Sequence, residues 1–272
     1  MGSNRPENRK GQPVQGPSKA AVTTRALSVG YGRETIVADI NLILPKGELL
    51  ALVGSNGSGK TTLLRTIAGL LKPISGSLEV LGGPPLAQPW RVAYMGQFHP
   101  SSFMLPLRAI EVVRMSRFAA HGLLGRLTAE DEKAVEEAID LMGLGGIAMR
   151  PLNTLSGGQR QRVFIAQAFA HKAELILLDE PATNIDASSR ETYRSHVRDL
   201  AKRGVSTIIA THDIEEAAAC DQTLLLAHRV VAYGKGEEVL TAEALLSTFG
   251  IVGKYKEGRI VLVEREHGHG CD

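Results

Sequence analysis

Residues 54–61, Gly-Ser-Asn-Gly-Ser-Gly-Lys-Thr, constrain the fold of this chain more than any other stretch. They follow the apolar run of residues 49–53 and open a helical pattern over residues 60–71. The three glycines allow the backbone to curl, so that its N–H groups face the oxygens of a phosphate. A strand, a glycine-rich loop and a helix in this order predict an α/β fold with a nucleoside triphosphate site.

Four further side chains suit the chemistry of a bound triphosphate. Lys60 would reach the β and γ phosphates, and the Thr61 hydroxyl would coordinate Mg²⁺. Asp179 and Glu180 end the apolar run of residues 175–180, where strands of an α/β sheet bind their ligands. The first would hold Mg²⁺, directly or through water, and the second would orient or deprotonate an attacking water.

His212 ends the apolar run of residues 206–212 in the same way. A single histidine usually has a structural role. At the end of a strand that should neighbour residues 175–180, however, it is placed to donate a hydrogen bond to the γ-phosphate or to the attacking water. We therefore predict that His212 belongs to the catalytic site.

A second stretch, Leu-Ser-Gly-Gly-Gln-Arg-Gln-Arg at residues 155–162, also has the features of an anion site. Ser156 is a good N-cap, but glycine at 157 and 158 lowers helix propensity by on the order of 1 kcal/mol per residue. In exchange, glycine leaves the N–H groups of the first turn accessible at the end of the helix that attracts anions. The sequence therefore predicts a second phosphate site in addition to the one at residues 54–61.

The rest of the chain fits an α/β sheet that carries a helical insertion. Residues 105–150 have helical periods, including an amphipathic helix that starts with acidic residues and ends at Gly143. A hairpin is predicted over residues 223–234, turning at Ala227–Arg229. Further strands are predicted over residues 75–83 and 91–96.

Composition excludes several classes of function. Aromatic residues make up only 4% of the 272 residues, which argues against a stacking platform for single-stranded nucleic acid. The net charge of +2 comes from residues 1–20, so the remaining chain has no basic surplus for DNA binding. No apolar run approaches the roughly 18–20 residues that span a bilayer. Cys220 and Cys271 have no metal or redox spacing, and we expect two reduced thiols.

These motifs resemble those of the nucleotide-binding subunit of ATP-binding cassette (ABC) transporters, over residues 22 to about 250. Residues 54–61 match the Walker A motif of that family, and residues 175–180 match Walker B with the catalytic glutamate. Residues 155–159 match the signature motif, and residues 184–186 resemble the D-loop. The remaining matches are Gln97 for the Q-loop glutamine, His212 for the switch histidine and Tyr31 for the aromatic residue that stacks on adenine.

The resemblance implies a role for each of these residues. Within one subunit, ATP would be bound by Tyr31, Gly54, Ser55, Asn56, Gly57, Ser58, Gly59, Lys60, Thr61 and Thr62. The ATP of a second subunit, arranged head to tail, would be contacted in trans by Ser156, Gly157, Gly158, Gln159 and Asp186. The catalytic residues would be Lys60, Gln97, Glu180 and His212, and Mg²⁺ would be held by Thr61, Gln97 and Asp179.

The implied architecture is a P-loop NTPase of the ABC type, with a mixed β-sheet, an antiparallel β-subdomain and an inserted helical subdomain at about 100–160. Residues 1–20 are expected to be a disordered tail, residues 21–250 the ATPase domain, and residues 251–272 a short C-terminal extension. His267, His269, Cys271 and Asp272 in that extension could bind Zn²⁺, but their close spacing in a flexible chain favours a solvated tail.

The resemblance also implies partners and a location. A cassette without membrane helices or coiled coils would serve separate permease subunits at the cytoplasmic face of the cell membrane, with ATP and Mg²⁺ as cofactors. Residues 105–117, 125–144 and 228–241 are similar to cassettes of manganese, zinc or chelated-iron importers, which also use an extracytoplasmic substrate-binding protein. The alternatives are a siderophore or cobalamin importer, an exporter, or a soluble ABC ATPase.

Overall fold

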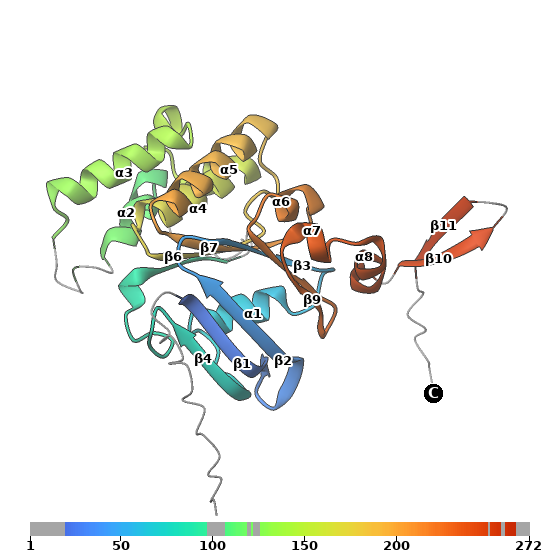
Figure 1. The fold of residues 1–272 in the computed structure, drawn as a ribbon. Helices are drawn as coiled ribbons and strands as arrows, with labels where there is room; N and C mark the ends of the chain where they lie inside the picture. The colour runs from blue at the N-terminus through green and yellow to red at the C-terminus, as the bar shows by residue number, and fades with distance from the viewer. Residues whose placement is uncertain are drawn as a thin grey trace, which may run out of the picture.

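A six-stranded sheet forms the centre of the computed structural model, which describes residues 20–96, 107–118, 121 and 126–249 and the backbone of 251–256 and 259–264 (Figure 1). Its strand order is β5-β6-β7-β3-β8-β9, and every neighbouring pair is parallel except β8 and β9. The strands are β3 (Leu49–Val53), β5 (Val92–Met95), β6 (Leu175–Asp179), β7 (Ser206–Thr211), β8 (Gln222–Leu226) and β9 (Val230–Gly234).

A smaller antiparallel sheet lies on the other side of helix α1 (Lys60–Ile67), as Figure 1 shows. Its order is β2-β1-β4, and its strands are β1 (Ala20–Tyr31), β2 (Glu34–Pro45) and β4 (Ser75–Val80). Short 3-10 helices lie at Pro89–Arg91, Gly145–Ile147 and Leu152–Thr154. This sheet is the antiparallel β-subdomain that the resemblance implies.

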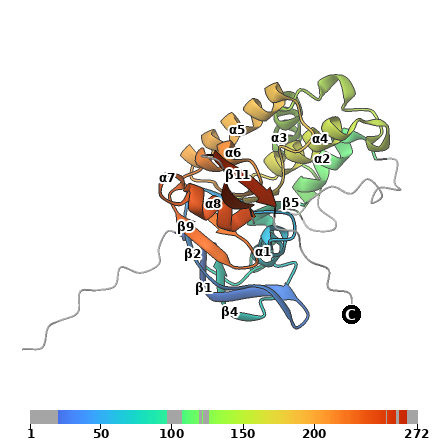
Figure 2. The ribbon, with the colours of Figure 1, turned by 90° about the vertical axis from the view of Figure 1, so that its right-hand side faces the viewer.

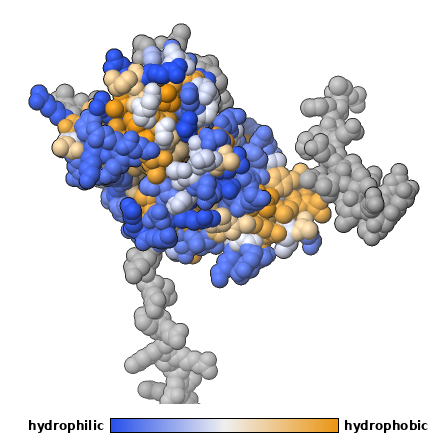
Figure 3. Space-filling view, turned by 90° about the horizontal axis from the view of Figure 1, so that it is seen from above, coloured by the Kyte–Doolittle hydropathy of each residue, from blue (hydrophilic) through white to orange (hydrophobic). Residues whose placement is uncertain are grey.

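Helices cover the opposite face of the six-stranded sheet (Figures 1 and 2). Helix α5 (Ala187–Lys202) lies beside a group formed by α2 (Ala109–Phe118), α3 (Ala129–Leu141) and α4 (Gly157–Ala170). Three short helices follow later in the chain: α6 (Ile214–Ala218), α7 (Gly236–Val239) and α8 (Ala242–Phe249). Seen from above, the surface is largely hydrophilic, with hydrophobic side chains exposed over the helices and next to α8 (Figure 3).

The central strands are buried on both faces. In β6, Leu175 and Leu177 pack with α1 and the antiparallel sheet, whereas Ile176 and Leu178 pack with the helical side. This explains why the sequence shows a continuous apolar run here rather than an alternating pattern. The sheet therefore separates two hydrophobic cores and holds the carboxyl ends of β3, β6 and β7 together.

Most predicted elements are confirmed, including the pairing of β6 with β7 and the β8–β9 hairpin. Helix α1 ends at Ile67 rather than at residue 71, because Gly69 has a φ of 77° and the Leu70 N–H bonds back to the carbonyl of Arg65. Helix α4 continues to Ala170, beyond the predicted end of the helical subdomain.

A two-stranded antiparallel hairpin, β10 (Ile251–Lys256) with β11 (Arg259–Glu264), was not anticipated in the C-terminal extension. Three predicted features lie outside the described residues: the disordered N-terminal tail over residues 1–19, Gln97, and the histidine-containing end of the C-terminal extension. Cys220 is a free thiol whose pKa is raised to about 12 by burial. Among the helices described, none has both the length and the apolar composition to cross a membrane.

Candidate active site

The loop of residues 54–61 lies between β3 and α1 and depends on its glycines. Gly57 and Gly59 have φ angles of 82° and 106°, a region that disfavours side chains. A Cβ on Gly54 would lie 2.3 Å from the carbonyl oxygen of Leu226, and one on Gly59 would lie 2.3 Å from Val37. Glycine is therefore required at these positions of the motif by the backbone conformation, by close packing, or by both.

The ammonium of Lys60 is folded back onto its own loop. It donates hydrogen bonds of 2.7 Å to the carbonyl of Gly54 and 2.9 Å to that of Ser55. Burial lowers the pKa of Lys60, while the charges of Glu180 and Asp179 oppose that shift. A desolvated cation whose hydrogen-bond partners are two neutral carbonyl groups is prepared to exchange them for charged phosphate oxygens.

The carboxylate of Asp179 is almost fully buried at the end of β6. Neither of its oxygens has a hydrogen bond of good geometry within the described structure, although the Thr61 hydroxyl lies near enough to lower its pKa. Desolvation is the larger effect and raises that pKa. A buried acceptor pair without donors, beside a threonine hydroxyl, fits the all-oxygen ligand set of Mg²⁺.

Glu180 follows in an unusual backbone conformation, with a φ of 52°. Its N–H donates a 2.9 Å hydrogen bond to the carbonyl of Ala210 in β7. Its Oε1 atom is buried without a hydrogen-bond partner in the described chain. A non-glycine residue held in the left-handed region often marks a functional position, because the surrounding structure must compensate the strain.

Glu180 lies between two pockets. One, of about 430 Å³, contains much of the predicted ATP site and is lined by Tyr31, Ile36, Asn56, Gly57, Gly59, Lys60, Thr61, Thr62 and Glu180. The other, of about 360 Å³, is lined by Glu180, Ala182, Thr183, Asn184, Arg190, Thr211, His212 and Asp213. Tyr31 is 45% exposed at the first pocket, so its ring is accessible for stacking with a nucleotide base. Ser58, within the loop of residues 54–61, is buried, and its hydroxyl has no hydrogen-bond partner in the part of the chain described.

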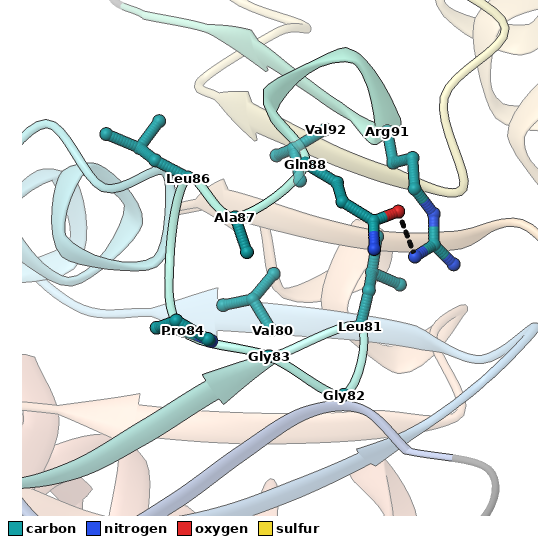
Figure 4. A pocket seen from close by; sticks show the side chains of 10 residues that line it. All are labelled: Val80, Leu81, Gly82, Gly83, Pro84, Leu86, Ala87, Gln88, Arg91 and Val92. Atoms are coloured by element: carbon teal, nitrogen blue, oxygen red, sulfur yellow. Dashed lines mark hydrogen bonds between the residues drawn. The ribbon is translucent and has the colours of Figure 1, made fainter.

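A smaller hollow between β4 and β5 is a poor candidate for nucleotide (Figure 4). It holds only about 50 Å³. Its one charged side chain, Arg91, is engaged by Gln88 at 2.7 Å and by Glu174 at 2.5 Å. The edge formed by β3, β6 and β7 is therefore the better candidate for the active site.

The signature motif begins helix α4 as predicted. Ser156 is the N-cap: its hydroxyl accepts from the N–H of Gln159 at 3.2 Å, and the Gln159 side chain accepts from the N–H of Ser156 at 3.0 Å. Ser156 and Gly157 are exposed, and no described atom lies within 4 Å of a Cβ built on Gly157. None of these residues lines the pocket that contains Lys60.

Two contacts of helix α4 within its own chain were not apparent from the sequence. A Cβ on Gly158 would lie 2.4 Å from the carbonyl oxygen of Asn184. The amide of Gln161 donates to the carbonyls of Glu180 at 3.2 Å and Pro181 at 3.1 Å. The only sequence signal for Gln161 is the repeated Gln-Arg in residues 159–162, which does not reveal its partners.

Asp186, predicted to contact ATP in trans, also has a local role. It is the N-cap of α5, and its carboxylate accepts from the N–H of Ser189 at 2.9 Å and from the Ser189 hydroxyl at 2.7 Å. These hydrogen bonds, the backbone one first, lower the pKa of Asp186. The D-loop segment is thus joined directly to the start of α5.

Comparison with known proteins identifies the family of the chain. The family model for ABC transporters matches residues 37–183. The manganese transport system ATP-binding protein MntB of Bacillus subtilis is 33% identical over 225 residues, which cover 82% of this chain and 90% of MntB. The zinc transport system ATP-binding protein TroB of Treponema pallidum is 33% identical over 231 residues, covering 85% and 87%.

Solved structures give the same result. A chain of an inward-facing ABC transporter described as of the metal-chelate type is 28% identical, with a TM-score of 0.73 over 90% of this chain and 98% of that one. The ATP-binding cassette MJ0796, in a post-hydrolysis dimer with ADP and Pi, is 26% identical, with a TM-score of 0.69 over 79% and 98%. The present chain therefore belongs to the ABC transporter family, as an ATP-binding subunit with ATPase activity.

Proposed function

We propose that two copies of this protein close head to tail on two ATP molecules and thereby power a membrane importer for manganese, zinc or chelated iron. The observation that carries the proposal is the start of α4. Ser156 and Gly157 present an exposed anion-binding helix end, while the pocket around Lys60 lacks any signature residue. A phosphate from a second copy would fill that end, and a two-fold dimer would contain two such composite sites.

In each composite site, Lys60 and the backbone N–H groups of residues 54–61 stabilise the charge that develops on the transferred phosphoryl group. Glu180 orients and deprotonates the attacking water, and His212 donates to the γ-phosphate or to that water. Ser156, Gly157 and Gly158 of the partner copy complete the contacts to the same phosphate. Tyr31 stacks on adenine at the exposed side of the pocket.

Asp179 and Thr61 would hold Mg²⁺, together with Gln97, which lies outside the described residues. The unpartnered carboxyl oxygens of Asp179 support this assignment. The ion would neutralise charge on the β and γ phosphates. Hydrolysis removes the γ-phosphate that joins the two copies, which allows them to separate.

The cargo and location rest on the relatives. MntB and TroB carry manganese and zinc in their names, and a siderophore transport relative from Bacillus subtilis is 35% identical over 85% of this chain. We infer that permease subunits bind this protein at the cytoplasmic face of the membrane and that an extracytoplasmic protein delivers the metal. We also propose that the ATPase domain comprises residues 21–250.

Two experiments test the proposal. The Glu180→Gln variant should form a dimer with ATP and Mg²⁺ and remain monomeric with ADP, as measured by light scattering; a monomer under both conditions would refute the head-to-tail arrangement. In the source organism, gene deletion should lower cellular manganese, zinc or iron. Restoring the wild type, but not Lys60→Ala, should correct the deficit, and unchanged levels of all three metals would refute the cargo.

A further inference from the structure

Arg117, in the last turn of α2, joins three helices. Its Nε atom donates to Oδ1 of Asp131 in α3 at 2.8 Å. Its Nη1 atom donates to the carbonyls of Ala170 at 3.1 Å and His171 at 2.6 Å, at the C-terminal end of α4. The Arg117 and Asp131 side chains are only 12% and 3% exposed, so most of the surface of this ion pair is covered by protein.

Asp131 is held firmly on its other side. Its Oδ2 atom accepts from the Thr128 N–H at 2.8 Å and the Thr128 hydroxyl at 2.6 Å, and lies 2.8 Å from Nε2 of His121. The hydrogen bonds from Thr128, followed by those from Arg117 and His121, hold the pKa of Asp131 well below its usual range. The carboxylate is therefore a fixed anchor for the guanidinium.

The two carbonyls that Arg117 binds lie at the far end of the signature helix. Helix α4 has 14 residues, which corresponds to about 21 Å, with Ser156 at one end and Ala170 at the other. The last carbonyls of a helix have no partner within the helix, and a cation there also complements the helix dipole. Because the helix is stiff, fixing its C-terminal end also fixes the direction in which its N-terminal N–H groups point.

Arg114 provides a natural comparison one turn earlier on α2. Its Nε and Nη2 atoms contact Glu132 of α3 at 2.9 and 2.8 Å. Both side chains are 37% exposed. Arg114 and Arg117 thus both connect α2 with α3, but the bonds to the end of α4 come from Arg117.

We propose that Arg117 is a positioning residue for the signature motif. It holds the C-terminal end of α4 against α2 and α3, so that Ser156, Gly157 and Gly158 meet the phosphate bound to the partner copy. The inference rests on the proposed head-to-tail dimer. Arg117 itself touches no nucleotide, and it acts through the orientation of the helix.

The test introduces Arg117→Ala, Arg117→Lys and Arg114→Ala separately into the Glu180→Gln protein. Two quantities are measured for each: the dimer dissociation constant with ATP and Mg²⁺, by analytical ultracentrifugation, and the affinity of the dilute monomer for a fluorescent ATP analogue. Arg117→Ala should weaken dimerisation by about tenfold or more, since small errors of orientation are costly at a site of this kind. Arg117→Lys should restore part of the loss, and Arg114→Ala should stay within about twofold of the parent.

Monomer affinity separates positioning from general damage, because the nucleotide pocket contains no residue of α2, α3 or α4. It should be unchanged in all three variants. Equal dimerisation of the Arg117 and Arg114 variants would overturn the inference, and so would a parallel loss of monomer affinity and dimerisation in Arg117→Lys. That lysine variant decides the question if Arg117→Ala does not fold. If the Glu180→Gln parent itself fails to dimerise, the proposed function fails first, whatever Arg117 does.

Discussion

Gly157 and Gly158 are adjacent in the signature motif, but the structure predicts opposite consequences when each is replaced by alanine. A methyl group on Gly158 would lie 2.4 Å from the carbonyl oxygen of Asn184, whereas real Cβ contacts begin near 3.0 Å. Helix α4 and the D-loop would have to separate by roughly 0.6 Å, and overpacking of this kind costs about 1–3 kcal/mol. The gain in helix propensity recovers at most about 1 kcal/mol.

Gly158→Ala should therefore lower the free energy of unfolding by about 1–2 kcal/mol, which corresponds to roughly 2–8 °C in Tm for a chain of this size. Gly157→Ala meets no described atom within 4 Å, so its Tm should stay the same or rise slightly. Its methyl group would nevertheless lie beside the exposed N–H groups that are proposed to bind the partner's phosphate. We expect it to weaken ATP-dependent dimerisation without loss of stability.

Thermal unfolding of both variants, followed by dimerisation in the Glu180→Gln background, tests the pair. Equal melting temperatures for the two variants would refute the inference that Gly158 lies too close to Asn184 to accept a methyl group. The proposed trans contact would be wrong if Gly157→Ala dimerised as tightly as the parent. The two measurements therefore examine the local geometry and the function separately.

Four further predictions concern single residues. Glu180→Gln should lower steady-state hydrolysis by roughly 100-fold or more while ATP still binds, and unchanged hydrolysis would exclude Glu180 as the base. Lys60→Ala should weaken nucleotide binding in equilibrium titrations, because it removes the cation that is proposed to bind the β and γ phosphates. Gln161→Leu should lower kcat more than it raises KM, since it frees the carbonyls of Glu180 and Pro181 but lies outside the ATP pocket. Burial, with help from the Arg117 charge, lowers the pKa of His171 to about 4, so protonation opposes folding as pH falls from about 6.5 towards 4. Urea unfolding should show a loss of about 2 kcal/mol between pH 7 and pH 5 from this group, and a smaller loss in His171→Gln.

Sequence patterns predicted the elements that depend on local rules. The strand, loop and helix around residues 54–61, the capping box at Ser156 and Gln159, and the buried run of β6 follow from spacing and hydrophobicity. Because parallel strands bring their carboxyl ends to one edge, the proximity of Asp179, Glu180 and His212 could also be predicted. The turn at Gly69, which ends α1 early, was overlooked because residues 68–71 still read as helical.

Long-range contacts could not be predicted in this way. Arg117 was placed correctly in a helical segment, but its carbonyl partners lie 53 and 54 residues further along the chain. Gln161 reaches Glu180 and Pro181, 19 and 20 residues away, only because α4 packs beside the end of β6. Periodicity determines which face of a helix is buried, and it does not determine the neighbour that covers that face.

These contacts give the signature helix two functions at once. Its N-terminal end is open to a phosphate from outside the chain, while Gly158 and Gln161 hold its side against the D-loop and the backbone of Glu180. Glu180 in turn has a strained φ of 52° and a hydrogen bond from its N–H to β7, the strand that ends next to His212. A displacement of α4 when the partner's phosphate arrives would therefore act directly on the backbone that carries the proposed base. We therefore expect occupation of the proposed trans site to be coupled, within a single chain, to the alignment of the residues proposed to act on the chain's own ATP.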